Sequence, residues 1–82
     1  MITEVPFPIM SEEDPAAEGV VGTWFVNHGE QVVAGQVIAE VQVEKVSQDV
    51  EAPVSGTMYQ YVAEGVGIAQ GAMMARIDSP DG

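Results

Sequence analysis

The sequence contains no cysteine and, among its 82 residues, only two basic residues, Lys45 and Arg76. The absence of cysteine excludes disulfide bonds, thiolate metal ligands and cysteine nucleophiles. Thirteen acidic residues give a formal net charge of −11, and two cations cannot form the basic surface that nucleic acid requires. The acidity itself leaves three readings open: solvation of the surface, recognition by a basic partner, or adaptation to high salt.

Long apolar runs are also missing. No run reaches the roughly 20 residues that span a bilayer, and the amino terminus lacks the pattern of a secretory signal, so we expect no membrane association and a cytoplasmic location. The chain is long enough for one domain, residues 1–82, and too short for two independent cores. Such a small domain has little surplus stability for a catalytic cleft, which favours a carrier or binding module over an enzyme. Met1 suggests a native amino terminus, and residues 79–82 are expected to be a terminus or the start of a linker.

Helical periodicity is absent as well. No segment keeps a 3.6-residue apolar period for three turns, and 5 prolines and 9 glycines interrupt the chain. Residues 11–18 are acidic and are predicted to form a surface loop or at most one helical turn. The first strand should be a short edge strand, because Pro6 and Pro8 remove two backbone donors. The predicted strands are residues 2–9, 20–26, 36–43, 46–51, 57–62 and 72–77.

Alternation of apolar and polar residues predicts which side chains enter the core. The segment 36–43 should bury Val37, Ala39, Val41 and Val43. Its other face should carry Gln36, Ile38, Glu40 and Gln42.

The only histidine, His28, stands before a glycine and is predicted to be a turn residue. It has no histidine or cysteine companion, which argues against a metal site or a catalytic role. Trp24 and Phe25 fall on opposite faces of their strand, so one of them is expected in the core.

Two halves of the sequence resemble each other. Val21-Gly22-Thr23-Trp24 matches Ser55-Gly56-Thr57-Met58 at an offset of 34 residues, and a second set of positions matches at an offset of 36. The second set pairs Gly29, Gly35, Val37-Ile38-Ala39 and Val41 with Gly65, Gly71, Met73-Met74-Ala75 and Ile77. The difference in offset predicts a small insertion near residues 59–62. Neither half can close its own apolar face, so the halves should pack about a pseudo-two-fold axis.

Lys45 is the only lysine, and it lies between two alternating strands. This spacing predicts a hairpin with Glu44 and Lys45 at its exposed tip. Neither residue is favoured in a tight hairpin turn, which is typical of a position with a functional requirement. The position alone, however, is more typical of an ordinary solubilising lysine on an edge turn. If the chain carries a covalent cargo on a side-chain amine, only Lys45 can hold it.

The chain resembles the biotinyl and lipoyl attachment domains over nearly its whole length. The residues that carry this resemblance are Glu18-Gly19-Val20-Val21, Val26, Gly29-Glu30-Gln31-Val32, Gly35-Gln36-Val37-Ile38-Ala39-Glu40-Val41, Glu44-Lys45-Val46 and Glu51-Ala52-Pro53-Val54-Ser55-Gly56-Thr57. The resemblance implies an all-β fold, a flattened β-barrel (barrel-sandwich hybrid) of two four-stranded sheets with pseudo-two-fold symmetry and the modified lysine at a hairpin tip.

Within this family, biotin acceptors typically place methionine on both sides of the lysine. Lipoyl acceptors typically place aspartate before it and alanine or valine after it. Glu44-Lys45-Val46 is similar to the second kind, so the resemblance implies covalent lipoic acid on Lys45, with Glu44 and Val46 as recognition flanks. The usual Glu-Thr-Asp-Lys is replaced here by Gln42-Val43-Glu44-Lys45.

The implied function is that of a lipoyl domain of a dihydrolipoyl acyltransferase component, a swinging arm in a 2-oxoacid dehydrogenase complex. The implied partners are a lipoate ligase or lipoyl transferase, a thiamin-diphosphate-dependent 2-oxoacid decarboxylase, a dihydrolipoyl acyltransferase and a dihydrolipoyl dehydrogenase. The domain itself would carry cargo and have no catalytic residues, and the loop of residues 11–17 is a candidate partner contact. Two alternatives stay open: a biotin carboxyl carrier domain and an unmodified barrel-sandwich interaction module.

Overall fold

The computed structural model describes residues 1–80. Asp81 and Gly82, which end the predicted terminal or linker segment, lie outside the described residues. The strands are β1 (Ile2–Pro6), β2 (Glu18–Trp24), β3 (Gln31–Val32), β4 (Val37–Val43), β5 (Val46–Glu51), β6 (Gly56–Gln60), β7 (Ile68–Ala69) and β8 (Met73–Asp78). The six predicted strands are confirmed. Residues 1–80 contain no helix that is long and apolar enough to cross a membrane.

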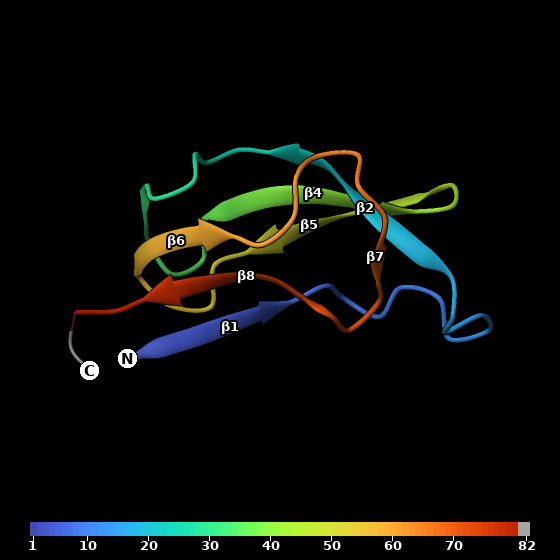
Figure 1. Ribbon diagram of the computed structural model, residues 1–82, viewed down its shortest axis with the longest axis horizontal. Coiled ribbons are helices and arrows are strands. Elements are labelled where there is room, and N and C mark those ends of the chain that lie inside the picture. Colours follow the sequence, from blue (N-terminus) through green and yellow to red (C-terminus); the bar gives the residue numbers. More distant parts are fainter. Residues whose placement is uncertain (81–82) are drawn as a thin grey trace.

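The strands form two four-stranded antiparallel sheets in the orders β1-β8-β6-β3 and β5-β4-β2-β7 (Figure 1). Adding four to each strand number of the first sheet, and continuing from β8 to β1, gives the order of the second sheet. This confirms the predicted pseudo-two-fold relation. Each sheet takes two strands from each half of the chain. Neither half can therefore complete a sheet alone, and the whole domain must fold as one unit.

The same relation holds for individual hydrogen bonds. The Gly29 amide donates to the Met58 carbonyl at 2.7 Å, and the Gly65 amide donates to the Val21 carbonyl at 3.0 Å. Gly29 and Gly65 also have similar φ angles, 84° and 79°, in the left-handed region that favours glycine. The recurring glycines of the sequence therefore mark equivalent turns.

The predicted insertion near residues 59–62 is wrong. Trp24 lies opposite Ala39 in its sheet, and Gln60 lies opposite Ala75 in the other. Trp24 is therefore equivalent to Gln60 and Ala39 to Ala75, each at an offset of 36 residues. The extra residue is in the first half, at Gly22, where the ladder between β2 and β4 shifts register. The match at an offset of 34 reflects similar composition rather than structural equivalence.

The core lies between the two sheets and contains no buried polar side chain among the described residues. Its members are Val5, Phe7, Val21, Val26, Val32, Ile38, Ala39, Val41, Val43, Val50, Ala52, Met58, Met74, Ala75 and Ile77. Ala39, Val41 and Val43 are buried as predicted, but Val37 is only half-buried and Ile38, predicted on the other face, is fully buried. The ladder between β4 and β5 shifts register between Val37 and Ala39, and such a bulge turns two successive side chains inward.

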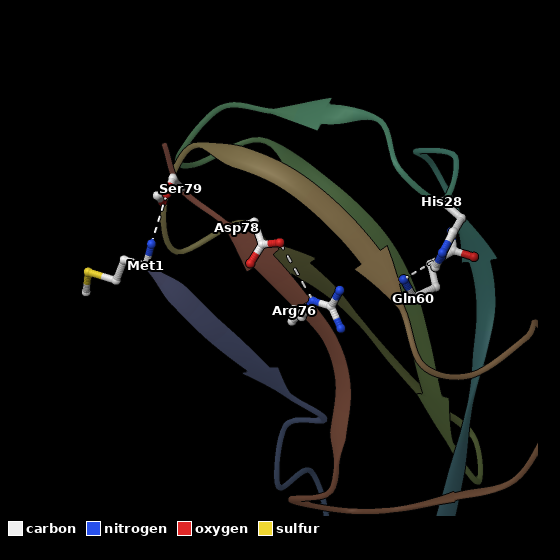
Figure 2. Close-up of polar contacts among 6 residues, drawn as sticks. All are labelled: Met1, His28, Gln60, Arg76, Asp78 and Ser79. Carbon is white, nitrogen blue, oxygen red and sulfur yellow. Dashed lines mark hydrogen bonds and ion pairs between the residues drawn. The ribbon is translucent and has the colours of Figure 1, made fainter. Parts of the chain in front are cut away.

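Met1, before β1, and Ser79, after β8, lie side by side at one end of the long axis. The Met1 ammonium donates to the Ser79 carbonyl at 3.0 Å, and the Ser79 amide donates to the Met1 carbonyl at 2.8 Å (Figure 2). Figure 1 shows the connection between β4 and β5 at the opposite end of the molecule. The longest dimension is 39 Å, so this separation is large for so small a domain.

Candidate functional site

The predicted hairpin tip is present between β4 and β5. Val43 and Val46 form the last pair of the ladder, so Glu44 and Lys45 alone make the turn. Hairpin turns of two residues require a positive φ at the first of them. Glu44 supplies it with a φ of 56°, the only positive φ of a non-glycine residue in the part of the chain that is described.

Lys45 is exposed, and within residues 1–80 its side chain has no hydrogen bond or ion pair. Val46, beside it, is 57% exposed. The first four residues of β5, Val46 to Asp49, are all exposed on this edge strand, and Val50 is its first buried residue. The hairpin tip is thus a narrow projection with the amine accessible to an approaching enzyme, which fits the covalent attachment of an acyl group such as lipoate.

Two surface hollows formed by the described residues lie elsewhere. One, of about 500 Å³, is lined by residues near the chain ends, among them Met1 and Ser79. The other, of about 450 Å³, is lined by Trp24 and His28 among others. Neither is lined by Glu44, Lys45 or Val46.

His28 has the structural role predicted from its place before Gly29. Its Nδ1 accepts the backbone N–H of Gln60 at 2.9 Å (Figure 2). Its ring packs edge-on against Tyr59 at a centroid distance of 5.4 Å. These contacts fasten the turn to β6. Among residues 1–80, no three histidine or acidic side chains gather in a way that could hold a metal ion.

Arg76 and Trp24 also have structural contacts. The Arg76 guanidinium lies 4.5 Å from the centre of the Tyr59 ring. Its Nε is 4.0 Å from an Asp78 carboxylate oxygen (Figure 2). An ion pair this long and half-exposed contributes little to stability. Trp24 packs against the core and donates its indole N–H to the Val62 carbonyl at 3.0 Å, whereas Phe25 is 56% exposed.

The acidic loop, residues 11–17, contains neither strand nor helix, as predicted, but Glu18, predicted as its last residue, begins β2. Sequence reasoning did not single out Gln70, whose side-chain amide contacts this loop and the residue before it. No local pattern could have found it, because its partners lie 53 to 60 residues away along the chain.

Residues 3–77 match the family model described as biotin-requiring enzymes, which covers biotin and lipoyl attachment domains. The chain is 30% identical over 80 residues to a dihydrolipoyllysine-residue succinyltransferase component of a 2-oxoglutarate dehydrogenase complex from Bartonella vinsonii subsp. berkhoffii. It is 38% identical over 65 residues to a dihydrolipoyllysine-residue acetyltransferase component of a pyruvate dehydrogenase complex from Staphylococcus aureus (strain N315). The alignments cover 96% and 78% of this chain, but only 19% and 15% of those relatives. The chain therefore belongs to the biotin and lipoyl attachment family.

Proposed function

We propose that the chain is a lipoyl carrier domain in which lipoic acid is joined by an amide bond to Lys45. The observation that carries this proposal is that the only lysine of the sequence stands exposed on a two-residue hairpin tip. The neighbours Glu44 and Val46 support lipoate over biotin, because biotin acceptors of this family have methionine at both places. The relatives are named as components that carry a dihydrolipoyllysine residue, which supports the same choice.

In the attachment step, Lys45 contributes only its amine. An exposed lysine is protonated at neutral pH, so a lipoate ligase or lipoyl transferase must remove a proton and supply an activated lipoyl group. The Nζ lone pair then forms a bond to the carbonyl carbon, and the activating group leaves with its bonding electrons. The amide is neutral, so the net charge of the domain becomes more negative by one.

Once attached, the lipoyl group supplies a disulfide that takes up acyl groups and electrons. The proposed attachment point is exposed on a hairpin tip, at the end of the molecule opposite the start of β1 and the end of β8 (Figure 1). Tethering keeps the reactive group at a high effective concentration near each enzyme that it visits. This role requires no catalytic side chain in the domain.

We assign the domain to a 2-oxoacid dehydrogenase complex, because its relatives are named as parts of such complexes. The cytoplasmic location expected from the sequence is part of this proposal. Its partners there are a thiamin-diphosphate-dependent 2-oxoacid decarboxylase, a dihydrolipoyl acyltransferase and a dihydrolipoyl dehydrogenase. The acidic loop lies at the same end of the long axis as the hairpin tip, so it is the proposed contact for the decarboxylase (Figure 1).

The proposal is tested by the intact mass after incubation with lipoate, ATP and a lipoate ligase, followed by peptide mapping. One lipoyl group should appear on Lys45 and none on a Lys45→Arg variant, which keeps the charge; circular dichroism should show both proteins folded. An adduct on the variant would refute the site. A biotin adduct in a matched reaction with biotin ligase would identify a biotin carrier, and no adduct on the folded wild type would favour an unmodified interaction module.

A further inference from the structure

The connection from β1 to β2 breaks the pseudo-two-fold symmetry. It comprises residues 7–17, whereas its counterpart between β5 and β6 comprises only residues 52–55. The two connections begin alike, because the Phe7 amide donates to the Ala72 carbonyl and the Ala52 amide donates to the Gln36 carbonyl, each at 2.8 Å. Four residues are thus enough for this connection, and the seven further residues are not required by the topology.

This longer connection lies where an enzyme acting on Lys45 must approach. Figure 1 shows it at the same end of the long axis as the turn between β4 and β5. The acidic residues Glu12, Glu13 and Asp14 are all exposed. The acidic loop is therefore available to a partner that docks at the lysine end.

One side chain holds both ends of the acidic loop. Gln70 Oε1 accepts the backbone N–H groups of Met10 at 2.7 Å and Ser11 at 2.8 Å. Gln70 Nε2 donates to the backbone carbonyls of Ala17 at 2.9 Å and Asp14 at 3.2 Å. These four hydrogen bonds use both acceptor sites and both donor hydrogens of the carboxamide.

Among the described residues, no side chain at the opposite end of the molecule makes an equivalent set of hydrogen bonds. Gly71 and Gly35 are equivalent turn glycines with φ angles of 85° and 89°, so the residue equivalent to Gln70 is Ala34. Ala34 has no polar side-chain atoms, and its own backbone N–H donates to Ser55 Oγ at 2.9 Å. A carboxamide thus occurs at only one of the two equivalent positions, beside the seven further residues.

We infer that Gln70 is a positioning residue that holds the acidic loop in a fixed conformation for docking of the 2-oxoacid decarboxylase. This inference rests on the proposed function. Gln70 does not belong to the hairpin tip and acts through the loop alone. Without its four hydrogen bonds the loop must become ordered during docking, which weakens binding but does not alter the reacting groups.

The test compares four lipoylated proteins: wild type, Gln70→Met, Gln70→Glu and Gln36→Met. Methionine removes all four hydrogen bonds while keeping the length of the side chain. Gln36 is the matched control, because its Oε1 accepts one backbone N–H, that of Val33 at 3.0 Å, in the turn before β4. The assay measures the decarboxylation of pyruvate and of 2-oxoglutarate as a function of domain concentration. The enzymes are the decarboxylase components of a pyruvate dehydrogenase complex and of a 2-oxoglutarate dehydrogenase complex.

For Gln70→Met, the domain concentration at half-maximal rate should rise about three- to tenfold with kcat within about twofold of wild type. Hydrogen exchange at the Met10 and Ser11 amides should be about tenfold faster. Gln36→Met should change none of these values. Gln70→Glu, which keeps the Oε1 acceptor but loses the donor to Asp14 and Ala17, should show the same direction of change.

Faster exchange at Met10 and Ser11 without a change in the half-saturating concentration would overturn the inference, because Gln70 would then be purely structural. A fall in kcat alone would also overturn it. Intact mass separates failure of the inference from failure of the proposed function. If wild type takes up no lipoyl group on Lys45, both the proposed function and the inference fail. A fully lipoylated Gln70→Met protein with unchanged kinetics refutes the inference alone.

Discussion

The turn residue Glu44 allows a direct test of how the hairpin tip is built. Its φ of 56° lies in the left-handed region, which costs an L-residue about 1–2 kcal/mol. Glycine avoids this cost but loses about 0.5–1 kcal/mol more backbone entropy on folding. Glu44 is exposed, and its side chain has no hydrogen bond or ion pair with the described residues. Glu44→Gly should therefore raise the free energy of unfolding by about 0.5–1 kcal/mol.

Thermal unfolding measures this difference. For a domain of this size, 1 kcal/mol shifts the midpoint by about 4–8 °C, so Glu44→Gly should raise Tm by about 2–8 °C. Glu51→Gly is the matched control, because Glu51 is an exposed glutamate on the edge strand β5 without a positive φ. The same substitution there should lower the free energy of unfolding by about 0.5–1 kcal/mol. A fall in Tm for both variants would refute the argument from turn geometry.

The same variant separates stability from recognition. If the Glu44 carboxylate is read by the attaching enzyme, Glu44→Gly should be lipoylated more slowly although it is more stable, and Glu44→Asp should retain most of the rate. An unchanged initial rate for Glu44→Gly would refute a recognition role for this carboxylate. The combination of higher stability with slower lipoylation would explain why an unfavourable turn residue is present at the tip.

Two further predictions concern the body of the domain. Gly19→Ala should lower the free energy of unfolding by about 1–3 kcal/mol in chemical denaturation, because the added Cβ would collide with the Phe7 ring and lie 2.7 Å from the Gln42 carbonyl oxygen. Gly22→Ala is the control, because its Cβ would be 3.6 Å from its nearest neighbour, and it should leave the free energy of unfolding within about 0.5 kcal/mol of wild type. Equal losses of stability in the two variants would contradict the packing argument. Raising the ionic strength from about 0.01 M to 0.1 M should increase Tm, since a Debye length reduced from about 30 Å to 10 Å weakens repulsion in a chain of net charge −11; a decrease would show that attractive pairs dominate.

Local patterns predicted the strands that are long enough to show one. Alternation over residues 36–43 and 46–51 located β4 and β5, and the two residues left between them located the turn. The strands β3 and β7 were missed, because two residues cannot display a period. Ile38 was placed on the wrong face because a bulge is a property of the strand pair, and one strand's sequence does not reveal it.

The candidate site divides in the same way. The exposure of Lys45 and the turn at Glu44 follow from residues that are neighbours in sequence, so they were predicted correctly. The link from Gln70 to Met10 joins residues 60 positions apart and involves only backbone atoms of the loop. These backbone atoms do not depend on the residue type, so the loop sequence does not indicate that Gln70 is hydrogen-bonded to it.

The pseudo-two-fold symmetry explains why the hairpin tip and the pair of Met1 and Ser79 are far apart. Ser79 follows Val43 by 36 residues, the offset that relates β4 to β8, so the hydrogen-bonded pair of Met1 and Ser79 is the counterpart of the pair of Val43 and Val46. At one end of the molecule these equivalent strands are joined by Glu44 and Lys45, and at the other they are not joined. A duplicated fold that closes on itself necessarily leaves one such pair unconnected. Its counterpart is then the hairpin at the opposite end of the molecule, which is where the group proposed on Lys45 would be attached (Figure 1).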